Sequence, residues 1–221
     1  FWNLESGDTV TRPLLHGSIT DLDFSQDGER LAIAGSSLAV VWDVKKLGEI
    51  QDGLASIPSN ASDAKLFELR DHVDVVSSIK FSTDGSRLLT ASWDGSAIVW
   101  DADSGEALHS LKGHIGRLAD DAFSPDGRLI ATAGFDGETI LWDAKKGEKI
   151  FVLGSGGEPL RDVVFSPDGK HLVTSDNSGA VHIYVVPTED LLALAHERVT
   201  RGLTEKECQI FLHSSTCPNG P

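Results

Sequence analysis

A Trp-Asp dipeptide recurs along this chain at nearly constant spacing and closes the same local pattern each time. It stands at residues 42–43, 100–101 and 142–143. A Phe-Ser-x-Asp-Gly run lies upstream of each dipeptide. A fourth such run, at 165–169, precedes Tyr184, which stands 42 residues after Trp142, where a further Trp would fall. A repeat of about forty residues indicates supersecondary units that bury their apolar faces only by stacking on one another.

The unit from His114 to Asp143 shows the internal organisation most clearly. The unit predicts three short strands, at 118–124, 129–133 and 139–142, and the segment after it predicts a fourth, at 149–153. The Pro, Asp and Gly between the first two are typical of a tight turn. Four short strands at regular spacing, separated by Gly and Asp turns, predict an antiparallel sheet of the kind that forms one blade of a β-propeller.

The same frame fits three other stretches. Residues 71–101 match it almost position for position, and 17–43 match it with one-residue deletions on either side of the Phe-Ser-Gln-Asp-Gly run. Residues 161–185 match it in length but lack the signature residues. We therefore predict an all-β fold, with about four blades in residues 1–186 and the end of a preceding blade at Trp2.

Two segments depart from the repeat. The spacing from Trp42 to Trp100 is longer than the unit, and the excess, at about 45–66, is polar and rich in turn residues, which predicts a surface loop between blades. Residues 187–221 have the apolar spacing of a helix and then a capping box that begins at Thr204. They predict a short helical C-terminal tail.

Composition excludes several classes of function. The chain has 34 acidic and 19 basic residues and a net charge of −15, the wrong sign for binding nucleic acid or an anionic membrane. It has no long apolar run and no signal-peptide pattern at its first residues, so we expect a cytoplasmic protein. Cys208 and Cys217 are too few for a disulfide scaffold, and whether they are bonded to each other or reduced stays open.

These repeats resemble the WD-repeat family of β-propellers over roughly residues 1–186. In that family a hydrogen-bonded tetrad of His, Ser or Thr, Asp and Trp locks each well-formed blade. The resemblance implies one tetrad of His72, Thr90, Asp94 and Trp100, and a second of His114, Thr132, Asp136 and Trp142. The blade of Trp42 has Ile33 and Ser36 or Ser37 at the equivalent positions, and the blade of Tyr184 has Gly156, Thr174 and Ser178. The tetrad is absent from the first of these two blades, and we expect both to be looser or held by ordinary packing.

The tail carries a second resemblance, to the C-terminus of bacterial multidomain proteins that join WD repeats to signalling modules. Its matching residues fall between Leu191 and Pro218. This implies a bacterial source and a regulatory part of a larger chain. Because WD-repeat propellers usually close with seven blades, we expect missing N-terminal blades, with pairing of two chains into one ring and closure with four blades as the alternatives.

We find no enzyme signature, no metal site and no cofactor motif in this sequence. There is no phosphate-binding loop of the Walker type and no zinc-protease helix. His72, Thr90 and Asp94 have the residue types of a catalytic triad, but the resemblance implies a structural lock. Asp120 and Asp121 are adjacent on a predicted strand and should face opposite sides. No cluster of His and carboxylates is evident that would support a site in the channel.

A partner would bind at one rim of the propeller. The resemblance implies contacts from the residue before each tetrad Asp, which gives Trp93, Phe135 and Asn177, and from the start of each first strand, which gives Val75, Arg117 and Arg161. Aromatic residues and arginine are favoured at interfaces. Packing of the aromatics against neighbouring turns and simple solvation of the arginines are the alternatives.

The sequence thus predicts a non-catalytic module for protein interaction, scaffolding or sensing that binds a protein or peptide. A ligand-binding or enzymatic site in the central channel of a complete propeller is the main alternative. Self-association that completes the ring is a third possibility.

Overall fold

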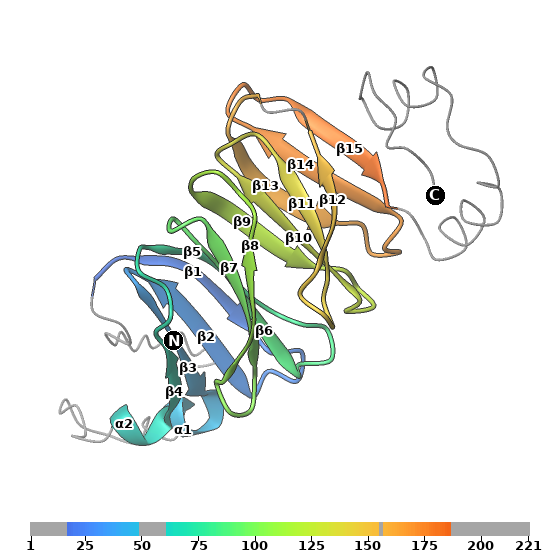
Figure 1. The fold of residues 1–221 in the computed structure, drawn as a ribbon. Coiled ribbons are helices and arrows are strands. Elements are labelled where there is room, and N and C mark those ends of the chain that lie inside the picture. Colours follow the sequence, from blue (N-terminus) through green and yellow to red (C-terminus); the bar gives the residue numbers. More distant parts are fainter. Residues whose placement is uncertain (1–16, 49–60, 155–156, 187–221) are drawn as a thin grey trace, which may run out of the picture. The chain divides into compact units, whose positions relative to one another are not determined.

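Consecutive strands group into four separate antiparallel sheets, which we call blades 1 to 4 (Figure 1). The computed structural model describes residues 17–48, 61–154 and 157–186. The predicted all-β propeller-type fold is confirmed, and each predicted strand of the unit from His114 lies within one residue of its observed bounds. The helical tail, both cysteines and Trp2 lie outside the described residues.

The strand order within each blade follows the sequence. Blade 1 consists of β1 (Ile19–Phe24), β2 (Arg30–Gly35), β3 (Leu38–Asp43) and β4 (Lys65–Leu69). Blade 2 consists of β5 (Val76–Phe81), β6 (Arg87–Ser92), β7 (Ser96–Asp101) and β8 (Ala107–Lys112). Blade 3 consists of β9 (Leu118–Phe123), β10 (Leu129–Gly134), β11 (Thr139–Asp143) and β12 (Lys149–Leu153). Blade 4 consists of β13 (Leu160–Phe165), β14 (His171–Asp176) and β15 (Val181–Val185).

The Phe-Ser-x-Asp-Gly run forms the turn between the first and second strands of every blade. In blade 2, the Ser82 hydroxyl donates to Asp84 at 2.6 Å and accepts the backbone N–H of Arg87 at 2.9 Å. Gly85 supplies the positive φ, 69°, that an L-residue rarely adopts. The hydrogen bonds from Ser82 and Ser86 lower the pKa of Asp84 to about 2. The run is therefore a self-contained turn whose polar groups bond one another.

Alternate residues of each central strand face the two neighbouring blades. Leu88 belongs to a buried cluster shared with Ala32 and Val41 of blade 1, whereas the adjacent Leu89 belongs to a cluster shared with Ile130 of blade 3. Side chains alternate across a strand, so one strand contributes to two cores. Burying one such leucine stabilises the fold by about 2 kcal/mol.

The insertion between β3 and β4 was predicted as a surface loop, and that prediction is wrong at both of its ends. Helix α1 (Val44–Gly48) begins directly after β3, and α2 (Ala61–Ala64) leads into β4, which itself starts inside the expected loop. Leu47 and Ala64 are 4% and 1% exposed and join Trp42 in one buried cluster. The polar composition of the insertion predicted an exposed loop and gave no sign that Leu47 and Ala64 are buried.

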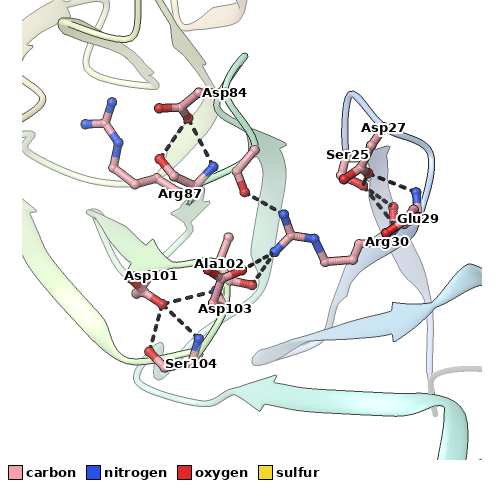
Figure 2. A network of polar contacts seen from close by, with 12 residues as sticks. Ser25, Asp27, Glu29, Arg30, Asp84, Arg87, Asp101, Ala102, Asp103 and Ser104 are labelled. Atoms are coloured by element: carbon pink, nitrogen blue, oxygen red, sulfur yellow. Dashed lines mark hydrogen bonds and ion pairs between the residues drawn. The ribbon is translucent and has the colours of Figure 1, made fainter.

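Arginines link the blades at the edge that carries the Phe-Ser-x-Asp-Gly turns (Figure 2). The Arg30 guanidinium of blade 1 donates to the carbonyls of Ala102 at 2.6 Å and Gly85 at 2.7 Å in blade 2, and it pairs with Asp103 at 3.0 Å. Arg87 repeats both carbonyl bonds to blade 3. A guanidinium presents several donors in a rigid plane, so one side chain satisfies two loops at once.

Candidate interaction surface

Blades 2 and 3 each contain a closed network of side chains between the outer turn and the core. In blade 2, His72 Nδ1 lies 2.9 Å from Asp94 and His72 Nε2 lies 2.8 Å from the Thr90 hydroxyl, which accepts the Trp100 indole N–H at 2.9 Å. Blade 3 repeats these contacts at 2.8–3.0 Å with the four equivalent residues. They are His114, Thr132, Asp136 and Trp142. The structure thus brings together both sets that the sequence singled out.

The hydrogen-bond pattern determines where the protons lie. The pKa of Asp94 is lowered to about 2, so its carboxylate accepts and His72 Nδ1–H donates to it. Nε2 of a neutral imidazole with that tautomer accepts the Thr90 O–H, and the Thr90 oxygen accepts the indole N–H of Trp100. Burial alone would raise the pKa of Asp94, but hydrogen bonds from Ser96 and His72 hold it at about 2. Every polar group of this buried network is therefore satisfied, which makes it a rigid support for the turn above it.

This geometry does not suit catalysis. The Thr90 and Thr132 side chains are 0% exposed, and each hydroxyl lies beneath a buried tryptophan. A nucleophile must reach the reacting atom of a substrate, and these oxygens reach only their histidine and indole partners.

Blades 1 and 4 depart from this arrangement. Ile33 faces Val40 in blade 1, at the place where Thr90 faces Ile98 in blade 2, and the buried Trp42 indole nitrogen has no hydrogen-bond partner in the described part of the chain. In blade 4, the buried Thr174 hydroxyl also lacks a partner among the described residues. Both blades rely on packing instead.

The tetrad carboxylates also hold the loops that lead into the first strands of their blades, β5 and β9. Asp94 accepts the backbone N–H of Val73 at 3.1 Å, and Asp136 accepts that of Ile115 at 2.7 Å. As a result, Val73 and Ile115 point their side chains outward and are 87% and 86% exposed. Sequence reasoning missed both residues, although an aliphatic residue directly after the tetrad His in two successive repeats was a usable signal.

The residues predicted for the binding rim occupy equivalent places in three blades. The backbone N–H groups of Trp93, Phe135 and Asn177, at the ends of the second strands, donate to carbonyls at the starts of the adjacent first strands in the same blades, at 2.8–3.0 Å. The acceptors are Val75, Arg117 and Pro159. The hydrogen bonds therefore tie each turn residue to the start of the first strand of its own blade.

Two arginines connect these turns across blade boundaries. The guanidinium carbon of Arg117, in blade 3, lies 4.4 Å from the centroid of the Trp93 ring in blade 2. That of Arg161, in blade 4, lies 5.7 Å from the Phe135 ring in blade 3, and its Nε donates to Asn177. We call Val73, Trp93, Ile115, Arg117, Phe135 and Arg161 the rim surface.

A second group of polar residues lies on the first strands of the four blades, along a hollow of about 650 Å³. Asp21 accepts the backbone N–H of Ile79 and the Lys80 ammonium, at 3.0 and 2.6 Å. Asp120 accepts the N–H of Val163 at 3.1 Å, which is the equivalent link from blade 3 to blade 4. These carboxylates join neighbouring blades through the backbone.

Asp120 and Asp121 do not face opposite sides, which corrects the prediction made from their adjacency. The Ser78 hydroxyl lies 2.9 Å from both of them and 3.3 Å from Asp21. A hydroxyl has one proton to donate, so at least one of these carboxyls must itself be protonated to bond it. These carboxyls form a cluster on the first strands of the blades, and no described histidine lines the hollow beside them.

Burial explains which carboxyls keep their protons. Asp121 is 0% exposed, and the equivalent residues of β5 and β13 are the buried Ile79 and Val163. Burial and the neighbouring Asp120 raise the pKa of Asp121 well above the ordinary range. Burial and a hydrogen bond with Asp162 raise the pKa of Asp120 to about 6. One oxygen of Asp121 has no partner among the described residues.

Among the residues that the structure describes, no three His, Cys, Asp or Glu side chains are arranged to hold a metal ion. In the same part of the chain, no helix is long and apolar enough to cross a membrane.

Comparison with known proteins gives one family and several relatives. The family described as WD domain, G-beta repeat, matches residues 9–43, 64–101, 105–143 and 147–184. WD repeat-containing protein 1 of Gallus gallus is 28% identical over a match that covers 41% of this chain and 20% of that protein. The Antiviral protein SKI8 of Saccharomyces cerevisiae is 35% identical over 40% of this chain and 23% of its own length. The chain thus matches about a fifth of the length of these relatives.

Proposed function

The chain belongs to the WD-repeat family, and from that premise we propose that it is a non-catalytic module that binds a protein or peptide through the rim surface. WD repeats generally mediate protein–protein interaction or scaffolding. The observation that carries the proposal is the stacking of Arg117 on Trp93, together with two aliphatic side chains that are almost fully exposed in the loops before β5 and β9. Exposed aliphatic residues beside aromatic and arginine side chains are typical of interface anchors.

The support beneath this surface favours binding over a purely structural role. Val73 and Ile115 are held outward by the tetrad carboxylates, which are themselves fixed by buried histidines. A surface that is rigid before binding loses less conformational entropy when a partner docks.

A site in the channel is the second candidate, because the hollow on the first strands is lined by several carboxyls and Lys80. The contacts there favour a structural role. Asp21 and Asp120 accept backbone N–H groups of the next blade, and Asp121 is inaccessible. These groups are used to join blades, so we place the interaction at the rim.

We propose that the module is the C-terminal regulatory part of a bacterial signalling protein in the cytoplasm, a reading carried by residues that lie outside the described ones. Self-association that completes a ring belongs to the same proposal.

Affinity capture with the whole chain tests the function. We expect a protein that is retained by the wild type and lost with Val73→Ser/Ile115→Ser, since both side chains are exposed and their replacement leaves the core intact. Lys145→Gln/Lys170→Gln, which alters exposed lysines elsewhere, is the matched control and should retain it. Retention of the same proteins by the rim variant would refute the proposal.

A further inference from the structure

Arg117 and Arg161 are unusual among the arginines of this acidic chain. Arg30 and Arg87 use their N–H groups on backbone carbonyls, and Arg70 pairs with Glu68. The exposed Arg117 side chain stacks on the Trp93 ring and makes no hydrogen bond or ion pair with a described residue. Arg161 adds to its ring contact a single hydrogen bond, to an amide oxygen, within the same part of the chain. With 34 acidic residues in the chain, neither has a carboxylate partner in that part.

Stacking prepares both guanidinium groups for an external acceptor. A ring contact holds the guanidinium flat and leaves the N–H groups at its edge free. Those N–H groups form a rigid fork that matches the two oxygens of a carboxylate. The two arginines stand at different positions of the repeat. Pro159 occupies the place in blade 4 that corresponds to Arg117, and Arg161, two residues further along, lies over the Phe135 ring. The same stacked arrangement is therefore present at both blade boundaries.

Resting on the proposed function, we infer that the rim surface binds a peptide segment whose carboxylate side chains meet Arg117 and Arg161 and whose aliphatic side chains cover Val73 and Ile115. Charge complementarity selects this occupant. The chain as a whole carries a net charge of −15 and repels acidic peptides at long range, so an acidic ligand needs local cations with unused hydrogen-bond donors, which Arg117 and Arg161 supply at the rim surface.

Three short fluorescein-labelled peptides, in which Leu alternates with Glu, with Gln or with Lys, test the inference by fluorescence anisotropy on the whole chain. We expect the Glu peptide to bind tightest. Arg117→Gln/Arg161→Gln should weaken it by about tenfold or more, because charge-assisted hydrogen bonds are lost. The variant Lys145→Gln/Lys170→Gln removes the same charge from exposed lysines and should leave the affinity unchanged.

The other outcomes separate this inference from the proposed function. Equal binding of the Glu and Gln peptides, weakened by Val73→Ser/Ile115→Ser, would keep the rim as a docking surface and overturn its preference for carboxylates. Preference for the Lys peptide with no effect of the arginine variants would show attraction to net charge alone and overturn the inference. Binding of none of the three would overturn it as well, and the capture experiment would then decide the proposed function by itself.

Discussion

The guanidinium carbon of Arg30 lies 5.3 Å from the centroid of the Phe81 ring in the next blade. One blade further on, Arg87 and Phe123 repeat the pair at 5.3 Å. The third boundary lacks it, because Leu129 stands opposite Asp143 where the two arginines stand opposite the Asp of their own Trp-Asp dipeptide. The stack and the two carbonyl bonds together make Arg30 and Arg87 links between blades.

Replacing Arg30 by Lys should lower the free energy of unfolding by about 1–2 kcal/mol, since an ammonium cannot bond both carbonyls while lying over the ring. Urea denaturation would measure the change. The control is Arg70→Lys, which alters an exposed pair with Glu68 and should cost under about 0.5 kcal/mol. Equal effects of the two substitutions would mean that the link contributes nothing.

Thr90→Val and Thr174→Val form a matched test of the tetrad. Both side chains are buried, but the Thr90 hydroxyl bonds His72 and Trp100, whereas that of Thr174 has no partner in the described structure. We expect Thr90→Val to destabilise by about 2 kcal/mol and Thr174→Val to change stability by less than about 0.5 kcal/mol or to stabilise. Thermal unfolding would separate them, and equal losses would contradict the network.

Trp42→Phe should cost about 1 kcal/mol less than Trp100→Phe. Both substitutions remove a similar apolar area, but only Trp100 loses an indole hydrogen bond, since the Trp42 nitrogen has no partner among the described residues. Denaturation of the two variants side by side provides the measurement. A larger loss for Trp42→Phe would show that its contacts with α1 and α2 outweigh the tetrad bond.

Asp121→Ile, which copies Ile79 of blade 2, should stabilise the protein more at about pH 8 than at about pH 5. The folded state holds the proton of Asp121 when the unfolded state has released it, because its pKa is raised. The native form therefore binds more protons, and wild-type stability falls as pH rises. The variant should remove part of that fall and gain about 2 kcal/mol at the higher pH.

Other titratable groups surround Asp121. Asp21 and Lys80 form an ion pair beside the site, and Asp120, whose pKa is raised to about 6, shares a hydrogen bond with Asp162. Asp120 should also lower the stability as pH rises, between the ordinary pKa of an aspartate and about pH 6. An equal gain for Asp121→Ile at both pH values would show that Asp121 is ionised throughout.

The blade architecture could be predicted because it follows from residues within one repeat, and the family resemblance implied the tetrads on top of that pattern. The spacing of Trp100 and Trp142 and the Asp-Gly turns specify four strands and their order, since strand alternation and turn chemistry are local properties. The anchors Leu47 and Ala64 were missed for the opposite reason, because their burial depends on a sheet face that the insertion itself does not encode.

The rim residues illustrate the division between sequence and structure most directly. The family resemblance implied that Trp93, Phe135, Arg117 and Arg161 lie at one edge, since the turns and the first-strand starts of stacked units share an edge. That each arginine lies over the aromatic ring of the preceding blade, and that Ser78 meets two carboxyls on a neighbouring blade, came only from packing. Contacts between blades depend on how two sheets are rotated and spaced, and no single repeat carries that information.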